Sequence, residues 1–526
     1  MAKSRPGNGK HRELKGSVRK RPGGRAGEWR RNGRKAKHVN QGTLCGDEGR
    51  AAVRASVVAW KRRNGRGAKG RREVEGVTDR TPATTPAEVP PCLQGPRAKQ
   101  AGDVRARWAW TEQAVWTERM LTALERGVKG GCWFSLMDKV YALDNLRAAC
   151  ERVRANRGAA GVDHQTIEMF AHDVEANLGR LARSLREGTY GPQAVKRVWI
   201  PKAGKKELRP LGIPTVRDRV VQTALRSVLE PIFERKFHEH SYGFRPGRGC
   251  KDALRRVDQL MQQGYTWVVD ADLKSYFDTI PHDKLLECVR EEVADGRVLA
   301  LLQAFLTQGV LEGMETWTPE AGSPQGAVVS PLLSNIYLNP LDHAMAASGY
   351  EMVRYADDFV ILCRSADEAR TALEEVCTWT AQAGLVLHPD KTRIVDATQQ
   401  GGFDFLGYHF ERGRKWPRAK SLAKLKDTMR AKTRRLNGGS LQAIITTVNR
   451  TLVGWYEYFK HSHRYTFPSL DGWIRMRLRS ILRQRAGRKG RGRGKDHHRW
   501  PNAYFATHGL LSLTAAHAVA CQSLRR

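Results

Sequence analysis

Two pairs of aspartates stand where predicted β-strands end, and their carboxylates are of the type that binds metal ions. Asp357 and Asp358 interrupt two apolar runs in VRYADDFVILC, as the turn of a β-hairpin would. In WVVDADLKSYFD, strand alternation gives Asp270 and Asp272 the same side of another strand. Burying unpaired carboxylates side by side is costly, because desolvation and mutual repulsion both oppose their charged forms.

A divalent cation would remove this cost. If the two strands are neighbours, Asp272, Asp357 and Asp358 converge on one point, and an open site rich in oxygen suits magnesium bound jointly by protein and phosphate. The corresponding chemistry is a two-metal phosphoryl transfer, with an activated hydroxyl attacking and pyrophosphate leaving. An isolated Asp-Asp pair is also typical of a solvated turn, so other segments must decide between the two interpretations.

The composition of the chain favours a polyanionic partner. Its 526 residues include 91 Lys and Arg against 54 Asp and Glu, a formal net charge of +37, and such a field attracts nucleic acid. No apolar run approaches the roughly 18 residues of a membrane-spanning helix, which predicts a soluble, intracellular protein without a membrane partner. The nine cysteines include no CxxC pair, so neither a zinc site nor a redox motif is expected.

Composition and periodicity change along the chain. Residues 1–105 are rich in Gly, Arg, Lys and Pro and predict a basic, disordered leader, which is either an RNA-binding arm or a dispensable extension. Residues 106–410 mix strand and helix patterns and predict an α+β fold. Residues 411–485 are helical and basic, and the segment 486–526 opens with GRKGRGRGK before order signals return.

Several motifs together resemble one family. YADD, DLKSYFD, SPQGAVVSPLLSNIYLN, SYGFRPGRGC and RPLGIPTVRDRVVQTAL are similar to motifs of the reverse transcriptases encoded by bacterial group II introns, and they follow the family's order over about residues 130–410. The resemblance implies a right-hand polymerase, with fingers and palm in 106–410 and a helical thumb, the maturase or X domain, in 411–485.

The resemblance also assigns roles to the acidic residues. Asp272 and Asp357 match the ligands shared by two magnesium ions, for which manganese is able to substitute, and Asp358 matches the second acid of the hairpin, nearer the primer end. Lys391, in GLVLHPDKT, aligns with a lysine that protonates the departing pyrophosphate. Asp270 matches no ligand position and is expected to be a solvated or supporting acid.

Four further residues match substrate-binding positions. Lys202 and Arg209, in WIPKAGKKELRPLGIP, correspond to the fingers hairpin that closes over the triphosphate. Phe277 falls where an aromatic ring lies under the sugar of the incoming nucleotide and excludes a 2′-hydroxyl. Gln325, in AGSPQG, offers its amide to the nucleotide's 3′-hydroxyl or to the templating base pair.

The end of the chain carries two kinds of nucleic-acid signal. VNRTLVGWYEYFKH resembles the thumb segment that meets intron RNA, and its aromatic residues are expected either to stack on bases or to fill a helix core. RMRLRSILRQR distributes arginines around a helix, as expected of a nucleic-acid-facing or a solvated element. HRWPNAYFATHGLLSL resembles the tail of class C members, which lack an endonuclease domain, so 486–526 is expected to bind DNA.

These features predict an RNA-directed DNA polymerase that binds its group II intron RNA, assists splicing as a maturase and copies the intron into cDNA during retrohoming. Its expected partners are the intron RNA, target DNA with a primer 3′ end, and deoxynucleoside triphosphates, in the bacterial cytoplasm and at the nucleoid. Two alternatives stay open: a domesticated reverse transcriptase acting in DNA repair or phage defence, and an RNA-binding splicing cofactor without polymerase activity.

Overall fold

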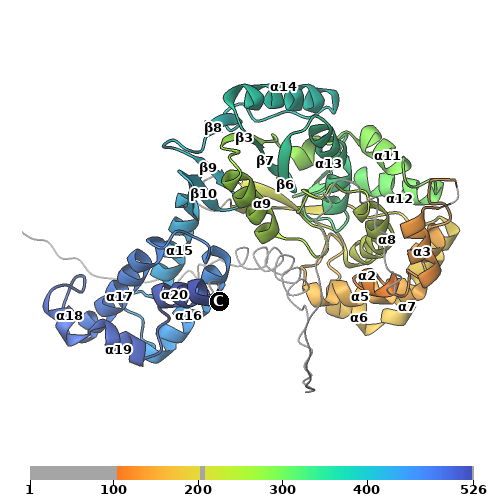
Figure 1. Cartoon of the computed structure of the whole chain (residues 1–526). Coiled ribbons are helices and arrows are strands. Elements are labelled where there is room, and N and C mark those ends of the chain that lie inside the picture. The colour runs from red at the N-terminus through yellow and green to blue at the C-terminus, as the bar shows by residue number, and fades with distance from the viewer. Residues whose placement is uncertain (1–103, 129, 202–207, 524–526) are drawn as a thin grey trace, which may run out of the picture. The chain divides into compact units, whose positions relative to one another are not determined.

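The computed structural model describes residues 104–128, 130–201 and 208–523. All described residues belong to one compact unit of the chain. The predicted leader, residues 1–105, therefore lies outside the described residues except for its last two positions. Helices and strands intermingle up to residue 417 and helices alone follow, so the predicted α+β class is confirmed (Figure 1).

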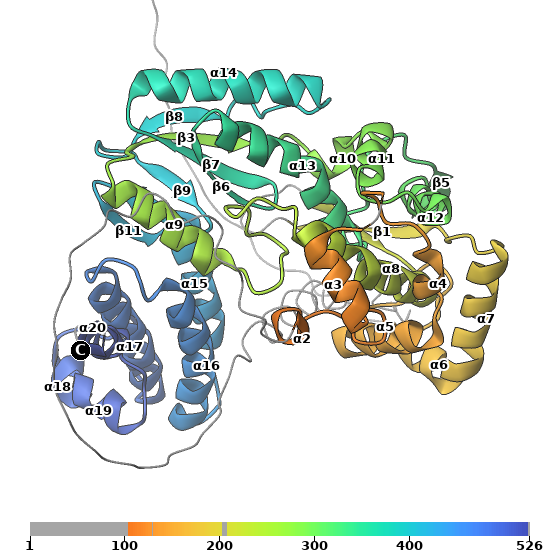
Figure 2. The ribbon, with the colours of Figure 1, turned by 45° about the vertical axis from the view of Figure 1, so that its right-hand side comes forward.

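The helices before the first strand pack around α8 (Val216–Glu234), a long helix with most of its side chains buried (Figure 2). Thr117, Thr166 and Thr215 begin three of the helices in this region, each accepting a hydrogen bond from a backbone N–H of the first turn. The elements before the first strand are α2 (Val104–Arg107), α3 (Glu118–Arg126), α4 (Met137–Val140), α5 (Leu143–Asn156), α6 (Ile167–His172) and α7 (Val174–Glu187).

A first sheet has the strand order β2-β1-β4-β5. β1 (Val195–Pro201) pairs with β2 (Leu208–Ile213) as an antiparallel hairpin and with β4 (Val310–Glu312) in parallel, and β4 pairs with β5 (Glu315–Trp317). The segment joining β1 to β2, residues 202–207, is outside the described residues. This sheet contains the hairpin that the sequence assigns to the fingers.

A second sheet, ordered β6-β7-β3-β8, carries the aspartates. Its strands are antiparallel: β3 (Trp267–Asp272), β6 (Glu351–Tyr355), β7 (Asp358–Cys363) and β8 (Arg393–Asp396). Alternate residues bury opposite faces. Val269, Phe359 and Ile361 join the core under α13 (Ser330–Ala347) and α14 (Ala366–Gln382), whereas Val268 and Val360 join the core under α9 (Cys250–Gln262). Figures 1 and 2 show α14 and α9 on opposite sides of these strands.

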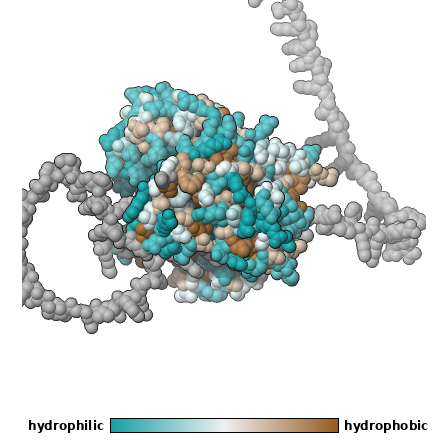
Figure 3. Space-filling model, turned by 90° about the vertical axis from the view of Figure 1, so that its right-hand side faces the viewer, coloured by the Kyte–Doolittle hydropathy of each residue, from teal (hydrophilic) through white to brown (hydrophobic). Residues whose placement is uncertain are grey.

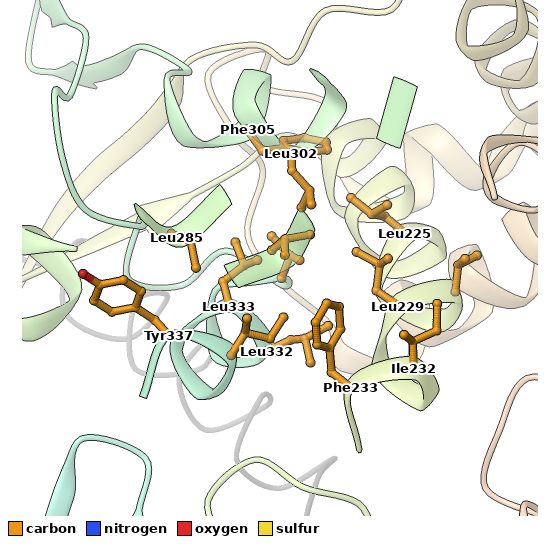
Figure 4. Close-up of a cluster of buried hydrophobic side chains, with 14 of the residues drawn as sticks. Leu225, Leu229, Ile232, Phe233, Leu285, Leu302, Phe305, Leu332, Leu333 and Tyr337 are labelled. Atoms are coloured by element: carbon orange, nitrogen blue, oxygen red, sulfur yellow. The ribbon is translucent and has the colours of Figure 1, made fainter. Parts of the chain in front are cut away.

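The larger core joins helices that are distant in the sequence. Figure 4 shows side chains from α8, α11 (His282–Arg290), α12 (Gly296–Leu306) and α13 meeting in one cluster. The short α10 (Tyr276–Thr279) lies between β3 and α11 in the chain, and Tyr276 is buried with its hydroxyl donating to the Ser334 carbonyl at 2.8 Å. The acidic sheet is therefore backed by a continuous, close-packed interior.

Beyond residue 400 the chain builds a small sheet and then helices. β9 (Phe403–Phe405), β10 (Tyr408–Glu411) and β11 (Arg414–Pro417) pair in the order β11-β10-β9. The helices are α15 (Ala419–Lys432), α16 (Leu441–Phe459), α17 (Thr466–Arg485), α18 (Lys495–Arg499), α19 (Asn502–Thr507) and α20 (Leu513–Ser523). Trp500, Phe505 and Leu513 share one hydrophobic core with α15, α16 and α17.

The aromatic run near the end of α16 fills cores. Tyr456 is buried in the core of the C-terminal helices, and Phe459 is buried beside the strands β9 and β10. The Tyr458 hydroxyl donates to the Leu406 carbonyl at 2.6 Å, and the Tyr408 hydroxyl donates to the Tyr458 carbonyl at 2.6 Å. These rings were expected either to stack on bases or to fill a helix core, and most of them fill a core.

Several arginines of α17 are also used inside the domain. Arg479 is buried and donates to the Trp500 carbonyl at 2.9 Å, while Arg477 donates to the Thr433 carbonyl at 2.8 Å. Arg483 pairs with the buried Asp496 at 2.6 Å. These contacts tie α17 to neighbouring segments.

In the described part of the chain, none of the helices combines the length and apolar composition that a membrane crossing requires.

A buried ion pair supports the hairpin formed by β6 and β7. The Arg354 side chain is fully buried and donates to Asp342 Oδ1 at 2.7 Å, to Asn335 Oδ1 at 3.0 Å and to the Ala356 carbonyl at 3.0 Å. Asn335 in turn donates to the Gly243 carbonyl at 2.7 Å. A Cβ atom on Gly243 would lie 2.2 Å from the Ala356 nitrogen, so only glycine permits this approach.

Replacing Arg354 with Met should lower the free energy of unfolding by about 3–5 kcal/mol, because Asp342 is then left as a buried, unpaired charge. Adding Asp342→Leu should recover part of this loss. Midpoints of urea unfolding followed by circular dichroism measure both effects. Arg370→Met is the control, since its ion pair with Asp367 is solvent-exposed and should contribute little. A double variant as unstable as the sum of the two single variants would contradict the coupling.

Candidate active site

Strand register brings the predicted acidic residues together. Asp272, the last residue of β3, is the pairing partner of Asp358, the first residue of β7. Directly opposed residues of antiparallel strands have Cα atoms about 4.5–5.5 Å apart. Asp357 precedes Asp358 in the turn between β6 and β7, and Asp270 lies two residues before Asp272 on the same side of β3. The expected convergence of Asp272, Asp357 and Asp358 is therefore present in the backbone geometry.

The turn that carries Asp357 is strained. Tyr355 pairs with Asp358, so only Ala356 and Asp357 connect the two strands. Ala356 has a φ of +61°, in the left-handed region that residues with a Cβ rarely adopt. Its carbonyl is held by the Arg354 guanidinium and its nitrogen lies against Gly243. Strain of this kind persists where the surroundings fix the backbone, and it concentrates at functional sites.

The carboxylates destabilise one another's charge. Desolvation raises the pKa of Asp357, with Asp272 adding repulsion and with a backbone hydrogen bond, Arg209 and Arg354 opposing the rise. Desolvation, followed by repulsion from Asp357, Asp270 and Asp272, raises the pKa of Asp358 to about 7. Asp358 nevertheless keeps an exposed surface, so the site is open on its side. Crowded acids with raised pKa values are typical of sites that act on a cation or a proton.

Lysine and arginine side chains partly offset this repulsion. The Lys391 ammonium contacts the Asp272 carboxylate, so a cation already lies beside one of the predicted ligands. Asp270 pairs with Arg393 at 3.3 Å. Desolvation raises the pKa of Asp270, and Arg393 opposes that rise.

The donor set suits a hard divalent cation. The acidic side chains at this end of the sheet offer carboxylate oxygens, and such ligands favour magnesium or manganese over softer metals. Among the described residues, no group of three or more His, Cys, Asp and Glu side chains is placed so that it could hold a metal ion. The pair Asp272 and Asp357 therefore fits an open site in which a substrate supplies further oxygens.

Two of the predicted substrate-binding residues, Phe277 and Gln325, lie on segments that contact each other. Phe277 is half-buried on α10, and its carbonyl accepts a hydrogen bond from the Ser323 nitrogen at 2.7 Å. Gly322 has a φ of +93°, and a Cβ there would lie 2.7 Å from the Phe277 carbonyl oxygen. The Gln325 carbonyl accepts from the Gly212 nitrogen of β2 at 2.6 Å. The turn containing Gln325 is therefore fixed between Phe277 and the first sheet.

Of the two predicted triphosphate-binding residues, Arg209 and Lys202, the structure describes only Arg209. Arg209 is exposed on β2 and pairs across the hairpin with Ile200. It is close enough to Asp357 to oppose the desolvation that raises the pKa of that carboxyl. Lys202 lies outside the described residues.

The sequence did not predict the residues that support the acidic hairpin. The hairpin is held by hydrogen bonds among Arg354, Asp342 and Asn335, and Gly243 leaves room for its turn. Arg354 could have been recognised from the sequence, because it is a charged residue within the apolar strand that precedes the acidic turn. Asn335 and Gly243 belong to motifs that the family resemblance already included.

Comparison with known proteins gives two family matches. Residues 200–410 match the family model for reverse transcriptase (RNA-dependent DNA polymerase), and residues 422–500 match the model for the group II intron maturase-specific domain. The first match includes β2 and all four strands of the acidic sheet, and the second begins within α15.

Individual relatives are similar over different lengths. Protein YkfC of Escherichia coli is 34% identical over 350 residues, covering 59% of this chain and 87% of that protein. The group II intron-encoded protein LtrA of Lactococcus lactis is 39% identical over 201 residues, which are 38% of this chain and 33% of LtrA. A chain of a Cas6-RT-Cas1–Cas2 complex aligns over 47% of this chain and 42% of its own length, with 22% identity and a TM-score of 0.31.

The two family matches and the length of the similarity to YkfC lead to one assignment. The chain belongs to the reverse transcriptases encoded by group II introns, and it is an RNA-directed DNA polymerase with a maturase domain.

Proposed function

We propose that the enzyme extends a primer 3′ end at its target DNA with deoxynucleoside triphosphates, using its own group II intron RNA as template. The register that sets Asp272 against Asp358, beside Asp357, is the observation that carries this proposal. The same enzyme binds the folded intron and assists its splicing. The maturase-specific match and the net charge of +37 support this second role, since a basic surface gains affinity for RNA by releasing counterions.

The acids have distinct roles in this proposal. Asp272 and Asp357 would hold two magnesium ions, for which manganese would be able to substitute. The bound ions would activate the primer hydroxyl and stabilise the leaving pyrophosphate. Asp358, whose surface is exposed, lies nearer the primer end. Lys391 exchanges its contact with Asp272 for one with the departing pyrophosphate, to which its ammonium gives a proton.

The fingers and the turn around Gln325 select and hold the nucleotide. Arg209, together with Lys202, grips the triphosphate, because a guanidinium can bind two phosphate oxygens and an ammonium supplies a point charge. Phe277 lies under the sugar and excludes a 2′-hydroxyl by overlap. Gln325 contacts the nucleotide or the base pair it forms. Its fixed position between β2 and Phe277 supports this arrangement.

The site of action follows from the bacterial relatives. YkfC and LtrA come from Escherichia coli and Lactococcus lactis. We place this enzyme in the bacterial cytoplasm, bound to nucleoid DNA when it inserts the intron. Contacts to target DNA would come from the basic segment 486–526, whose helices share the core of the maturase domain.

Replacing Asp357 with Asn should reduce cDNA synthesis by at least about a hundredfold, because the site loses a charge that binds the cation. Affinity for intron RNA should change by less than about twofold, since the residue lies away from the maturase match. Primer extension on an RNA template and filter binding measure the two quantities. Asp367→Asn, on the exposed surface of α14 and outside the maturase match, is the control. Loss of both activities in the Asp357 variant would show that the residue is structural.

Replacing Phe277 with Ala should raise incorporation of ribonucleotides relative to deoxyribonucleotides by at least about tenfold, because the overlap with the 2′-hydroxyl disappears. Phe277→Tyr retains the ring and should keep the selectivity of the natural enzyme. Single-nucleotide extension with each type of triphosphate gives the ratio. An unchanged ratio in the alanine variant would refute the gate.

A further inference from the structure

The first sheet exposes two tryptophans next to the proposed nucleotide site. Hydrophobic residues form patches among hydrophilic ones on the face drawn in Figure 3. Trp199 of β1 is 43% exposed and Trp317 of β5 is 41% exposed. Burial of large aromatic rings stabilises a folded protein, so they are usually found in its interior. Aromatic rings that stay exposed are a common feature of binding surfaces.

An arginine and a glutamate fix the two rings. The Arg197 guanidinium carbon lies 4.8 Å from the centre of the Trp317 ring and 5.9 Å from that of Trp199. Glu312 Oε1 accepts a hydrogen bond from Trp199 Nε1 at 2.5 Å, and Glu312 Oε2 pairs with Arg197 at 3.5 Å. We call Arg197, Trp199 and Trp317 the indole cluster. Its members are oriented in advance, which lowers the entropy lost on binding.

Strand pairing connects the indole cluster to the nucleotide site. Arg197 pairs across the hairpin with Gly212, whose nitrogen donates to the Gln325 carbonyl at 2.6 Å. The chain also runs from Trp317 at the end of β5 directly to Gly322, which packs on the Phe277 carbonyl. Desolvation raises the pKa of Asp278, the neighbour of Phe277, and Arg197 and Arg209 both oppose that rise. The cluster therefore lies on strands that connect directly to the turn of Gln325 and to the backbone of Phe277.

The chemistry of the cluster suits bases better than phosphates. The Arg197 charge is already shared with Glu312, so it is poorly placed to bind a triphosphate. Flat indole rings and a guanidinium plane offer stacking surfaces to any unpaired base. A base inside a duplex has no free face for such stacking. At an RNA-directed polymerase, the unpaired strand next to the incoming nucleotide is the template that has not yet been copied.

We propose that the indole cluster is a stacking site for unpaired bases of the RNA template ahead of the nucleotide being copied. This inference rests on the proposed polymerase function. The cluster would hold the next template bases in an extended, single-stranded form, and so keep local RNA structure from re-forming at the entrance to the active site. A docking surface for another protein is the competing interpretation.

The length of the template overhang tests the proposal. Fluorescence anisotropy would give the affinity of the full-length enzyme for primer–template duplexes with either no overhang or six unpaired template nucleotides. The natural enzyme should bind the overhang form more tightly, and Trp199→Ala and Trp317→Ala should each weaken that binding by about tenfold while affinity for the blunt duplex is retained. Phe134→Ala, which removes an exposed ring from a different region, should have no effect.

Abasic templates locate the contact and exclude a general loss of folding. Removing the base that stacks on Trp317 should weaken binding by the natural enzyme and cause no further loss in Trp317→Ala. Trp317→Phe should restore much of the overhang effect, and thermal melting of each variant reports its folding. Variants that bind every overhang as the natural enzyme does, with primer extension intact, would overturn the stacking site and favour a protein partner. A natural enzyme that fails to extend any primer would instead overturn the proposed function.

Discussion

Repulsion between carboxylates is the constraint on which the rest of the structure depends. Antiparallel register sets Asp272 against Asp358, and a strained two-residue turn adds Asp357, so the sheet concentrates negative charge where it is poorly solvated. Such an arrangement persists only if the backbone beneath it is fixed and a cation is available above it. The Lys391 ammonium beside Asp272 meets part of that need in the protein alone.

The support comes from segments that are distant in sequence. Arg354 joins the hairpin to Asp342 and Asn335 on α13, and Asn335 joins it to Gly243 before α9. Both faces of the sheet are buried, one under α13 and α14 and the other under α9. The turn around Gln325 is held against both β2 and Phe277. Groups held in this way need little rearrangement when charge develops during a reaction, which is the main source of catalytic power in many enzymes.

The sequence predicted the strand ends and the turn that carry Asp272, Asp357 and Asp358, because strand alternation and apolar flanks are local signals. It predicted less about long-range partners. No local pattern predicts that Arg354 is buried in an ion pair with Asp342. Nor does one predict that Arg477 and Arg479 donate hydrogen bonds to backbone carbonyls of their own domain instead of facing solvent. The aromatic residues near Phe459 had two open interpretations, and only the tertiary packing of α16 against β10 decides between them. The indole cluster combines β1, β4 and β5, which only the folded sheet brings together.

Binding of manganese followed by electron paramagnetic resonance tests the central claim, that Asp272 and Asp357 share a divalent cation, most directly. The free ion gives a strong signal that weakens on binding, so a titration reports affinity without requiring catalysis. We expect Asp272→Asn to lose the tightest site, whereas Asp270→Asn, which removes the partner of Arg393, should keep it. Equal manganese affinity in the natural enzyme and the Asp272 variant would show that Asp272 is not a ligand of the cation.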